Sequence, residues 1–269
     1  MRRSRLSAYV ASLVLAVGAA LTGAATAQAA GTAAAGGYVA LGDSYSSGLG
    51  AGSYISSSGD CKRSTKAYPA LWAAANSPSS FDFTACSGAR TSDVTASQLG
   101  PLSTATSLVS ISIGGNDAGF ADIMTTCVLQ SDSACVARIN TAKAFVDSTL
   151  PGRLDTVYSA VRAKAPSARV VVLGYPRFYQ LGASGCVGLS ETKRRALNGA
   201  ADYINTATEK RALDHGFTFG DVRPAFAGHE LCSGSSWMLS VNWLNISESY
   251  HPTAAGQAGG YLPVLDSAA

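Results

Sequence analysis

The sequence lacks several features that would point to common classes of protein. It has no Cys-x-x-Cys pair and no cluster of cysteine with histidine, so no zinc motif is recognisable. After residue 30, no apolar run is long enough to cross a membrane. Three of the 20 Lys and Arg residues, namely Arg2, Arg3 and Arg5, lie in the N-terminal segment discussed next. Without them the chain has 17 basic residues and 17 Asp and Glu, so its net charge is zero. A neutral chain lacks the basic footprint of nucleic-acid binding, so we expect no nucleic-acid partner. Because no zinc motif is recognisable, we also expect no metal.

The N-terminus has the order of a secretory signal. Arginines in Met1–Arg5 precede an apolar run at Tyr9–Leu21, and small residues then lead to Ala27-Gln28-Ala29. A basic, an apolar and an Ala-x-Ala segment in this order indicate a signal peptide. We therefore predict a signal peptide at residues 1–29, a flexible N-terminus at 30–37 and a single domain at 38–269. The mature product is expected to be extracellular, with no stable membrane insertion.

Six cysteines lie in the predicted mature chain, and an even number in an exported protein indicates disulfides. Sequence alone allows fifteen pairings. We expect the nearest-neighbour order because it closes modest local loops: Cys61–Cys86, Cys127–Cys135 and Cys186–Cys232.

Candidate strands alternate with candidate helices along the chain. Five short runs, most of them β-branched or aromatic, predict buried strands at Tyr38–Leu41, Phe81–Thr84, Leu108–Ile113, Arg169–Leu173 and Phe217–Gly220. Helices are predicted at Thr65–Asn76, at Ser133–Lys164 with an interruption at Pro151, and at Ser190–Asp214. This alternation predicts an α/β domain with a parallel sheet of about five strands, whose functional loops follow the carboxyl ends of the strands.

Histidine, the commonest general base near neutral pH, occurs only three times. His215 stands at the predicted end of a helix, where a cation complements the helix dipole, so a structural role is the better interpretation. His229 lies in a loop and could border a cleft, although loop histidines are usually solvated. His251 is followed by Pro252, which suits the first turn of a predicted helix. His251 is therefore the candidate base.

With the cysteines oxidised, the candidate nucleophile is a hydroxyl. Ser44 directly follows a predicted strand in Gly42-Asp43-Ser44, although this triplet alone could be an ordinary turn. Two further strand ends carry polar turns, with Gly88 in one and Gly114-Gly115-Asn116-Asp117 in the other. Together the three turns would bring a hydroxyl, a backbone amide and a carboxamide to one sheet edge, which is what a tetrahedral oxyanion needs.

Four blocks, taken in order, resemble those of the SGNH hydrolases, also called the GDSL family: Gly42-Asp43-Ser44, Gly88, Gly115-Asn116-Asp117 and Glu248-x-x-His251. The resemblance covers essentially the whole predicted mature chain. The Ser-Tyr-Ser-Ser-Gly after Asp43 and the Ser-Tyr-His-Pro ending are similar to the secreted bacterial lipases and phospholipases A1. The resemblance implies a three-layer, flavodoxin-like α/β/α sandwich.

The resemblance also implies a serine ester hydrolase that needs no cofactor. Ser44 would attack the ester carbonyl, and His251 would act as the general base. The oxyanion would be held by the amides of Ser44 and Gly88 and by the Asn116 side chain. We expect a monomer that acts on a lipid or another ester.

The group that orients His251 is left open between two candidates. The family's usual residue three positions before the histidine is Asp, and this chain has Glu248 there. The alternative is a backbone carbonyl, which by position would be that of Ser249. Asp43 and Asp117 are expected to be structural, because a carboxylate beside the oxyanion would oppose its charge.

The substrate is less well defined than the reaction. Trp237, Met238, Trp243 and Leu244 favour an acyl group, and hence phospholipid, triacylglycerol or simple esters, although they could equally be core residues. The alternative enzyme is a carbohydrate esterase that deacetylates polysaccharide, for which no clear cluster of aromatics is visible. A thioesterase or peptidase is chemically possible at the same site. A non-catalytic binding module would need a broken block, and none is broken.

Overall fold

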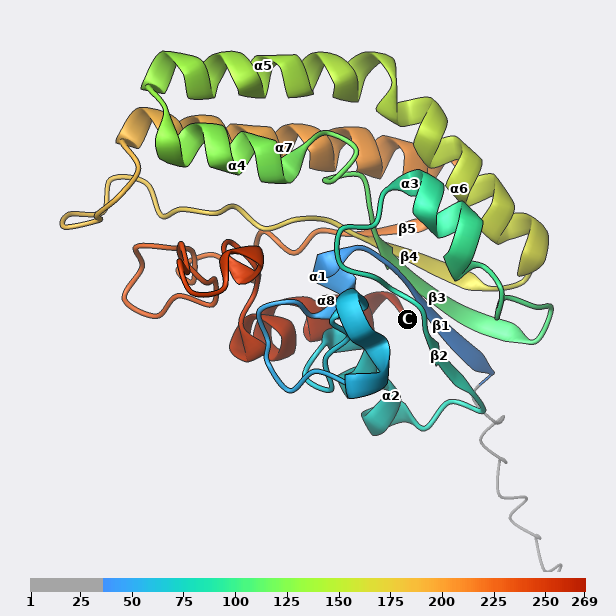
Figure 1. Ribbon diagram of the computed structural model, residues 1–269. Helices are drawn as coiled ribbons and strands as arrows, with labels where there is room; N and C mark the ends of the chain where they lie inside the picture. Colours follow the sequence, from blue (N-terminus) through green and yellow to red (C-terminus); the bar gives the residue numbers. More distant parts are fainter. Residues whose placement is uncertain (1–35) are drawn as a thin grey trace, which may run out of the picture. The chain divides into compact units, whose positions relative to one another are not determined.

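Five strands form one parallel sheet in the order β2-β1-β3-β4-β5 (Figure 1). A computed structural model describes residues 36–269. The strands are β1 Gly37–Gly42, β2 Phe81–Phe83, β3 Thr106–Ser112, β4 Arg169–Leu173 and β5 Thr218–Gly220. Each lies within two residues of its predicted bounds, so the predicted parallel sheet is confirmed.

Helices cover both faces of the sheet, which confirms the three-layer α/β/α arrangement (Figure 1). One face carries α2 (Tyr68–Asn76) and α8 (Leu262–Ala268), and the other carries α5 (Asp132–Ser148), α6 (Leu150–Lys164) and α7 (Glu191–Asp214), with α4 (Phe120–Leu129) packed on α5. The shorter elements are α1 Ser44–Ser47, η1 Ser56–Cys61, α3 Thr91–Asp93, η2 Val94–Gln98, η3 Ile246–Glu248 and η4 Gly256–Tyr261.

The helices depart from prediction at four places. Helix α2 begins at Tyr68, three residues after the predicted start at Thr65. The long predicted helix is interrupted at Thr149 and not at Pro151, because Pro151 lies in the first turn of α6, where its missing N–H costs nothing. Helix α4 was not predicted. The chain resumes helix at Ala254 rather than directly at Pro252.

The predicted signal peptide lies outside the described residues, as does most of the predicted flexible N-terminus. Strand β1 begins at Gly37, one residue before the predicted start. Within residues 36–269, none of the helices combines the length and the apolar composition that crossing a membrane requires.

The centre of the sheet forms the core and sets the place of the site. Strands β1, β3 and β4 are buried almost throughout, with Leu41, Ile111 and Val172 fully enclosed. The carboxyl ends of the neighbouring strands β1 and β3 lead directly to Ser44 and to Gly114. Parallel pairing therefore brings the two turns to one edge of the sheet.

Candidate active site

Ser44 lies in a sharp turn between β1 and α1. Gly42 has a φ of +124°, and a Cβ there would lie 2.5 Å from the Ser112 carbonyl oxygen, so only glycine fits at this position. The Asp43 carboxylate caps α1 by accepting a hydrogen bond from the Tyr45 backbone N–H at 3.0 Å. Ser44 is the first residue of α1 and is 6 % exposed. The turn thus fixes the Ser44 hydroxyl at the sheet edge.

Ser44 contacts His251 across 207 residues of sequence. The Ser44 Oγ lies 2.7 Å from His251 Nε2, and His251 Nδ1 lies 3.0 Å from the Ser249 carbonyl oxygen. Burial lowers the pKa of His251 to about 4, and the carbonyls of Ser249 and Glu248 oppose this shift only in part. At neutral pH the imidazole is therefore uncharged, with Nδ1–H donating to Ser249 and Nε2 free to accept the serine proton.

The Glu248 carboxylate binds a different partner. Its Oε1 accepts a hydrogen bond from the Tyr54 hydroxyl at 2.6 Å, and the same hydroxyl accepts one from the Gly50 N–H at 3.0 Å. Burial and the nearby carboxylate raise the pKa of Tyr54 to about 12. A Cβ on Gly50 would lie 3.0 Å from the His251 Cβ. Glu248 and Tyr54 therefore hold the loop that packs against His251, and Ser249 supplies the group at Nδ1.

Two aromatic rings pack against the imidazole. The Tyr45 ring lies 5.0 Å from the His251 ring, and Phe120 approaches edge-on at 5.9 Å. The Tyr45 hydroxyl donates to the Tyr250 carbonyl at 2.8 Å, and Tyr250 has a φ of +64°. This conformation costs a non-glycine residue about 1 kcal/mol or more, so the bond from Tyr45 helps to hold it. Tyr45 and Tyr250 stand in the two motifs that resemble the secreted lipases, Ser-Tyr-Ser-Ser-Gly and Ser-Tyr-His-Pro, whereas no sequence signal pointed to Phe120.

The two remaining blocks reach the same cleft. Gly88 and Asn116 line it together with Ser44 and His251. The Asn116 carboxamide donates to the Ala89 carbonyl at 3.0 Å, which leaves its second N–H for the cleft. The structure thus brings together all four blocks that the sequence singled out.

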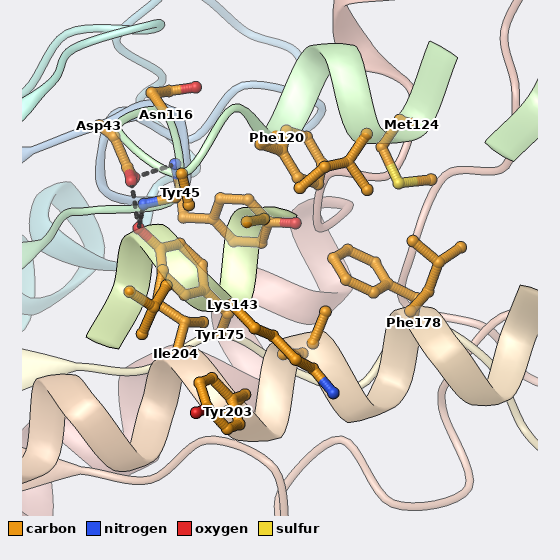
Figure 2. A pocket seen from close by; sticks show the side chains of 18 of the residues that line it. Asp43, Tyr45, Asn116, Phe120, Met124, Lys143, Tyr175, Phe178, Tyr203 and Ile204 are labelled. Carbon is orange, nitrogen blue, oxygen red and sulfur yellow. Dashed lines mark hydrogen bonds between the residues drawn. The ribbon is translucent and has the colours of Figure 1, made fainter. Parts of the chain in front are cut away.

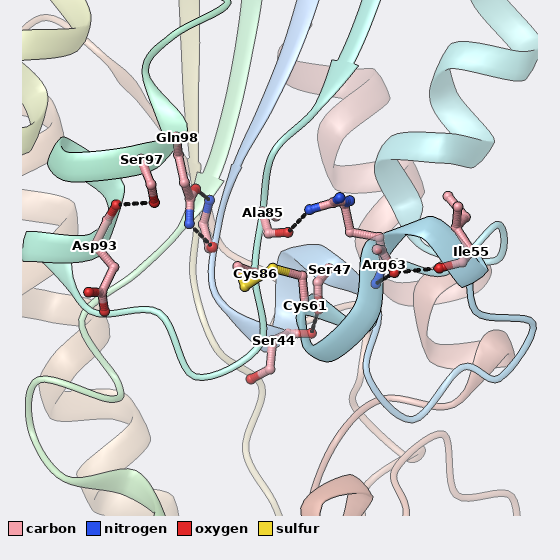
Figure 3. The surroundings of a disulfide bond; sticks show 12 residues. Ser44, Ser47, Ile55, Cys61, Arg63, Ala85, Cys86, Asp93, Ser97 and Gln98 are labelled. Carbon is pink, nitrogen blue, oxygen red and sulfur yellow. Dashed lines mark hydrogen bonds between the residues drawn. A yellow bond between two sulfur atoms is a disulfide. The ribbon is translucent and has the colours of Figure 1, made fainter.

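The disulfide between Cys61 and Cys86 lies beside Ser44 (Figure 3), and Cys86 precedes Gly88 by two residues. Cys61 pairs with Cys86, the Cys86 N–H donates to the Gly42 carbonyl, and the Ser87 N–H donates to the Cys61 carbonyl, both at 3.0 Å. The other two bridges are Cys127–Cys135 and Cys186–Cys232, so the six cysteines pair in the predicted order.

Asp43 and Asp117 both bond to the surrounding framework. Asp43 accepts hydrogen bonds from the hydroxyls of Ser112 and Tyr175, and Tyr175 also accepts one from the Gly115 N–H, which links two turns. Burial raises the pKa of Asp43 to about 6, against the effect of these bonds. Asp117 accepts from the Thr91 N–H and hydroxyl and pairs with Arg153. These contacts fit the structural roles expected of both.

The other two histidines lie outside the cleft. His215 directly follows α7, as expected, and its Nε2 lies 3.0 Å from an Asp155 carboxylate oxygen. His229 stacks on Trp237 with ring centroids 3.6 Å apart. The four apolar residues taken to favour an acyl group fall into a core pair and a surface pair. Trp237 packs on the core and Met238 is buried in it. Trp243 and Leu244 are 71 % and 100 % exposed, and Trp243 lines the cleft.

Known proteins share this arrangement along most of the chain. Residues 40–258 match the GDSL-like Lipase/Acylhydrolase family. A protein named Lipase 1 from Streptomyces coelicolor is 76 % identical over 269 residues, covering all of both chains. Among solved structures, phospholipase A1 from Streptomyces albidoflavus is 72 % identical with a TM-score of 0.86, covering 88 % of this chain and all of that one. An extracellular lipase from Streptomyces rimosus is 66 % identical with a TM-score of 0.85, covering 87 % of this chain and all of that one. The family match and these relatives agree with the strand-end turns that hold Ser44 and Asn116. The chain therefore belongs to the GDSL-like Lipase/Acylhydrolase family.

Proposed function

We propose that this chain is a secreted hydrolase of lipid carboxylic esters that works through a Ser44–His251 acyl-enzyme mechanism. The observation that carries the proposal is the 2.7 Å contact between Ser44 Oγ and His251 Nε2, in a cleft that both residues line. The relatives named lipase, phospholipase A1 and extracellular lipase support the reaction class and the location outside the cell. A signal peptide at residues 1–29 and a mature domain at 38–269 remain part of the proposal.

The first half of the reaction forms an acyl-enzyme. As Ser44 Oγ attacks the ester carbonyl carbon, its proton passes to His251 Nε2, and the carbonyl oxygen becomes an oxyanion. His251 then gives that proton to the departing alcohol oxygen as the carbon–oxygen ester bond breaks. In the second half a water molecule loses a proton to His251 and attacks the acyl-enzyme, and Ser44 leaves with the proton returned.

Three donors are proposed for the oxyanion. The backbone N–H groups of Ser44 and Gly88 come from the turns after β1 and β2, and the Asn116 carboxamide comes from the turn after β3. Donors fixed in place before the reaction are effective because they need no rearrangement as charge develops. Their fixed positions are supported by the Asn116–Ala89 bond and by the disulfide at Cys86, two residues before Gly88.

The Ser249 carbonyl is proposed to orient His251. It accepts from Nδ1–H and so selects the tautomer whose Nε2 can receive the serine proton. Glu248 is proposed as a positioning residue that acts through Tyr54 on the loop beside His251.

The surface around the cleft favours a lipid substrate. Four exposed apolar side chains, here called the apolar rim, lie at or beside its opening: Leu129, Trp243, Leu244 and Ile246. Exposed apolar groups gathered at a binding cleft usually mark an interaction site. This rim suits an aggregated ester better than a freely soluble sugar ester.

Hydrolysis of p-nitrophenyl esters with acyl chains of two to sixteen carbons tests the proposal. The purified mature protein should be active and should favour medium or long chains, and Ser44→Ala should lose activity by about 10⁴-fold or more. Activity confined to the acetate ester would favour a carbohydrate esterase. A Ser44→Ala variant as active as the parent would remove Ser44 from the mechanism.

A further inference from the structure

The space around Ser44 is divided in two by one face of helix α4. Phe120 and Met124, one helical turn apart, line both a cleft at the surface and a second hollow on the inner side of α4. Ser44 and Asn116 also line both. We call the first the outer cleft and the second the inner pocket; Figure 2 shows the inner pocket. The nucleophile thus lies at the junction of two spaces.

The inner pocket lies within the layer formed by α4, α5 and α7. Its walls are almost entirely apolar, with Phe178, Leu197 and Ile204 among them. Small residues on two facing helices leave room for it, namely Ala142 on α5 and Ala200 and Ala201 on α7. At the far end Lys143 lies 5.2 Å from the Tyr203 ring, whose hydroxyl donates to Asp147. A narrow apolar space that ends at polar, half-exposed groups fits an alkyl chain.

The position of His251 distinguishes the two spaces. His251 and Gly88 line the outer cleft but not the inner pocket. In the proposed mechanism His251 Nε2 gives its proton to the leaving alcohol, so that oxygen must lie within hydrogen-bond reach of His251. The acyl chain and the leaving alcohol extend from the carbonyl carbon in different directions. If the alcohol lies beside His251 in the outer cleft, the inner pocket is the space left for the acyl chain.

We propose that the inner pocket binds the acyl chain that is transferred to Ser44, and that Ala200 and Ala201 on α7 set the chain length it accepts. The outer cleft then binds the alcohol part, including the remainder of a glycerolipid. Phe120 and Met124 separate the two parts of the substrate. This inference rests on the proposed function and adds to it which side of the ester each space receives.

Two series of substrates separate the two spaces. In the first, p-nitrophenyl esters differ only in acyl length, and in the second, alkyl acetates differ only in alcohol length and are followed by acid release. Ala201→Phe should shorten the accepted acyl chain. Each methylene that is excluded from the pocket loses about 0.8 kcal/mol of burial, which lowers kcat/KM about fourfold. Exclusion of two or more methylenes should therefore lower kcat/KM for long-chain esters by more than about tenfold relative to acetate. The alkyl acetate series should not change.

Val128→Phe provides the reciprocal variant, because Val128 lines the outer cleft and not the inner pocket. It should alter the alkyl acetate series and leave the acyl-length profile unchanged. Since Ala201 is buried, Ala200→Leu at the half-buried neighbouring position serves if Ala201→Phe does not fold. An unchanged acyl profile in the folded α7 variants, or a change confined to the alcohol series, overturns the inference. Long-chain ester hydrolysis by the parent protein that depends on Ser44 would still leave the proposed function intact.

Discussion

The carbonyl oxygen of Ser249 lies 3.0 Å from Nδ1 of His251, the position at which an orienting group acts on a catalytic histidine. A carbonyl carries a partial charge and stabilises an imidazolium less than a carboxylate does. It nevertheless fixes the ring and its tautomer through the hydrogen bond at Nδ1. Tyr250 between them adopts its left-handed conformation with its own carbonyl bonded to Tyr45, so the segment is held from both sides.

Glu248→Gln should leave kcat within about threefold of the parent. The glutamine Oε1 can still accept the Tyr54 hydrogen bond, and the Ser249 carbonyl at Nδ1 is unchanged. Loss of a carboxylate that orients a catalytic histidine typically lowers kcat by about 10⁴. Steady-state kinetics on a soluble butyrate ester therefore distinguishes the two candidates. Glu248→Ala, which removes the acceptor, is the companion variant and should lower activity more than Glu248→Gln does.

The acid limb of kcat/KM should lie close to pH 4, well below the usual range for a histidine base. Burial lowers the pKa of His251 to about 4 from 6.5, so the imidazole stays neutral and able to accept a proton until the pH approaches 4. Rates measured from pH 3.5 to 8 on a soluble ester check this. An acid limb near pH 6.5 would contradict it.

The same shift affects stability. The unfolded chain binds a proton on His251 with a pKa near 6.5, whereas the folded chain does so only near 4. Between pH 6.5 and pH 4 the unfolded chain therefore binds this proton and the folded chain does not. The free energy of unfolding is highest, as far as His251 is concerned, above pH 6.5, and it falls as the pH is lowered toward 4. His251→Gln should flatten this part of the stability curve, measured by urea unfolding at fixed pH values.

Asn116→Ala should lower kcat by about 10²–10³ with little change in KM, because an oxyanion donor acts mainly in the transition state. The variant also loses the bond to the Ala89 carbonyl, so its thermal unfolding must be compared with that of the parent. Asn116→Asp retains the shape of the side chain but replaces the N–H donor with a carboxylate oxygen, and it should be at least as impaired. Near-parental kcat in a folded Asn116→Ala would remove this residue from the oxyanion site.

The strand-end turns were predictable because short apolar runs define the strands and parallel strands end at one edge. Ser44, Gly88 and Asn116 follow from that geometry together with the order of the four blocks. The link between Tyr54 and Glu248 was not predictable, because the two residues are 194 positions apart and Tyr54 stands in no recognisable pattern. Helix α4 was also missed, since it follows a glycine-rich turn and contains β-branched residues. Because α4 was not predicted, Phe120 and Met124 were not recognised as the residues that separate the outer cleft from the inner pocket.

The sequence could not separate core from surface among the apolar residues near the C-terminus. Trp237 and Trp243 are six positions apart, yet the first packs on Phe226 and the second lies exposed at the cleft. The difference is set by the strand-like contacts around His251: Leu239 pairs with residues 250 and 251, and Met238 forms a bridge with Pro252. The loop beyond Leu239 is thereby directed outward. Such long-range pairing leaves no periodic signal in a short segment.

Replacing Trp243 and Leu244 by serine should reduce hydrolysis of phospholipid vesicles by about tenfold or more, while a soluble short-chain ester is cleaved within about twofold of the parental rate. Insertion of one large apolar side chain into lipid contributes about 1.5–3 kcal/mol, so losing two should weaken adsorption strongly. Neither substitution alters the contacts of Ser44 and His251.

Leu213→Ser is the matched control, because Leu213 is also an exposed leucine, at 60 %, but lies near the end of α7 outside the cleft. An equal effect of the control variant would mean that apolar surface in general, and not the rim, governs adsorption. Equal losses on vesicles and on the soluble ester would place Trp243 and Leu244 in the bound substrate's own contacts, since only an interfacial role depends on the physical state of the lipid.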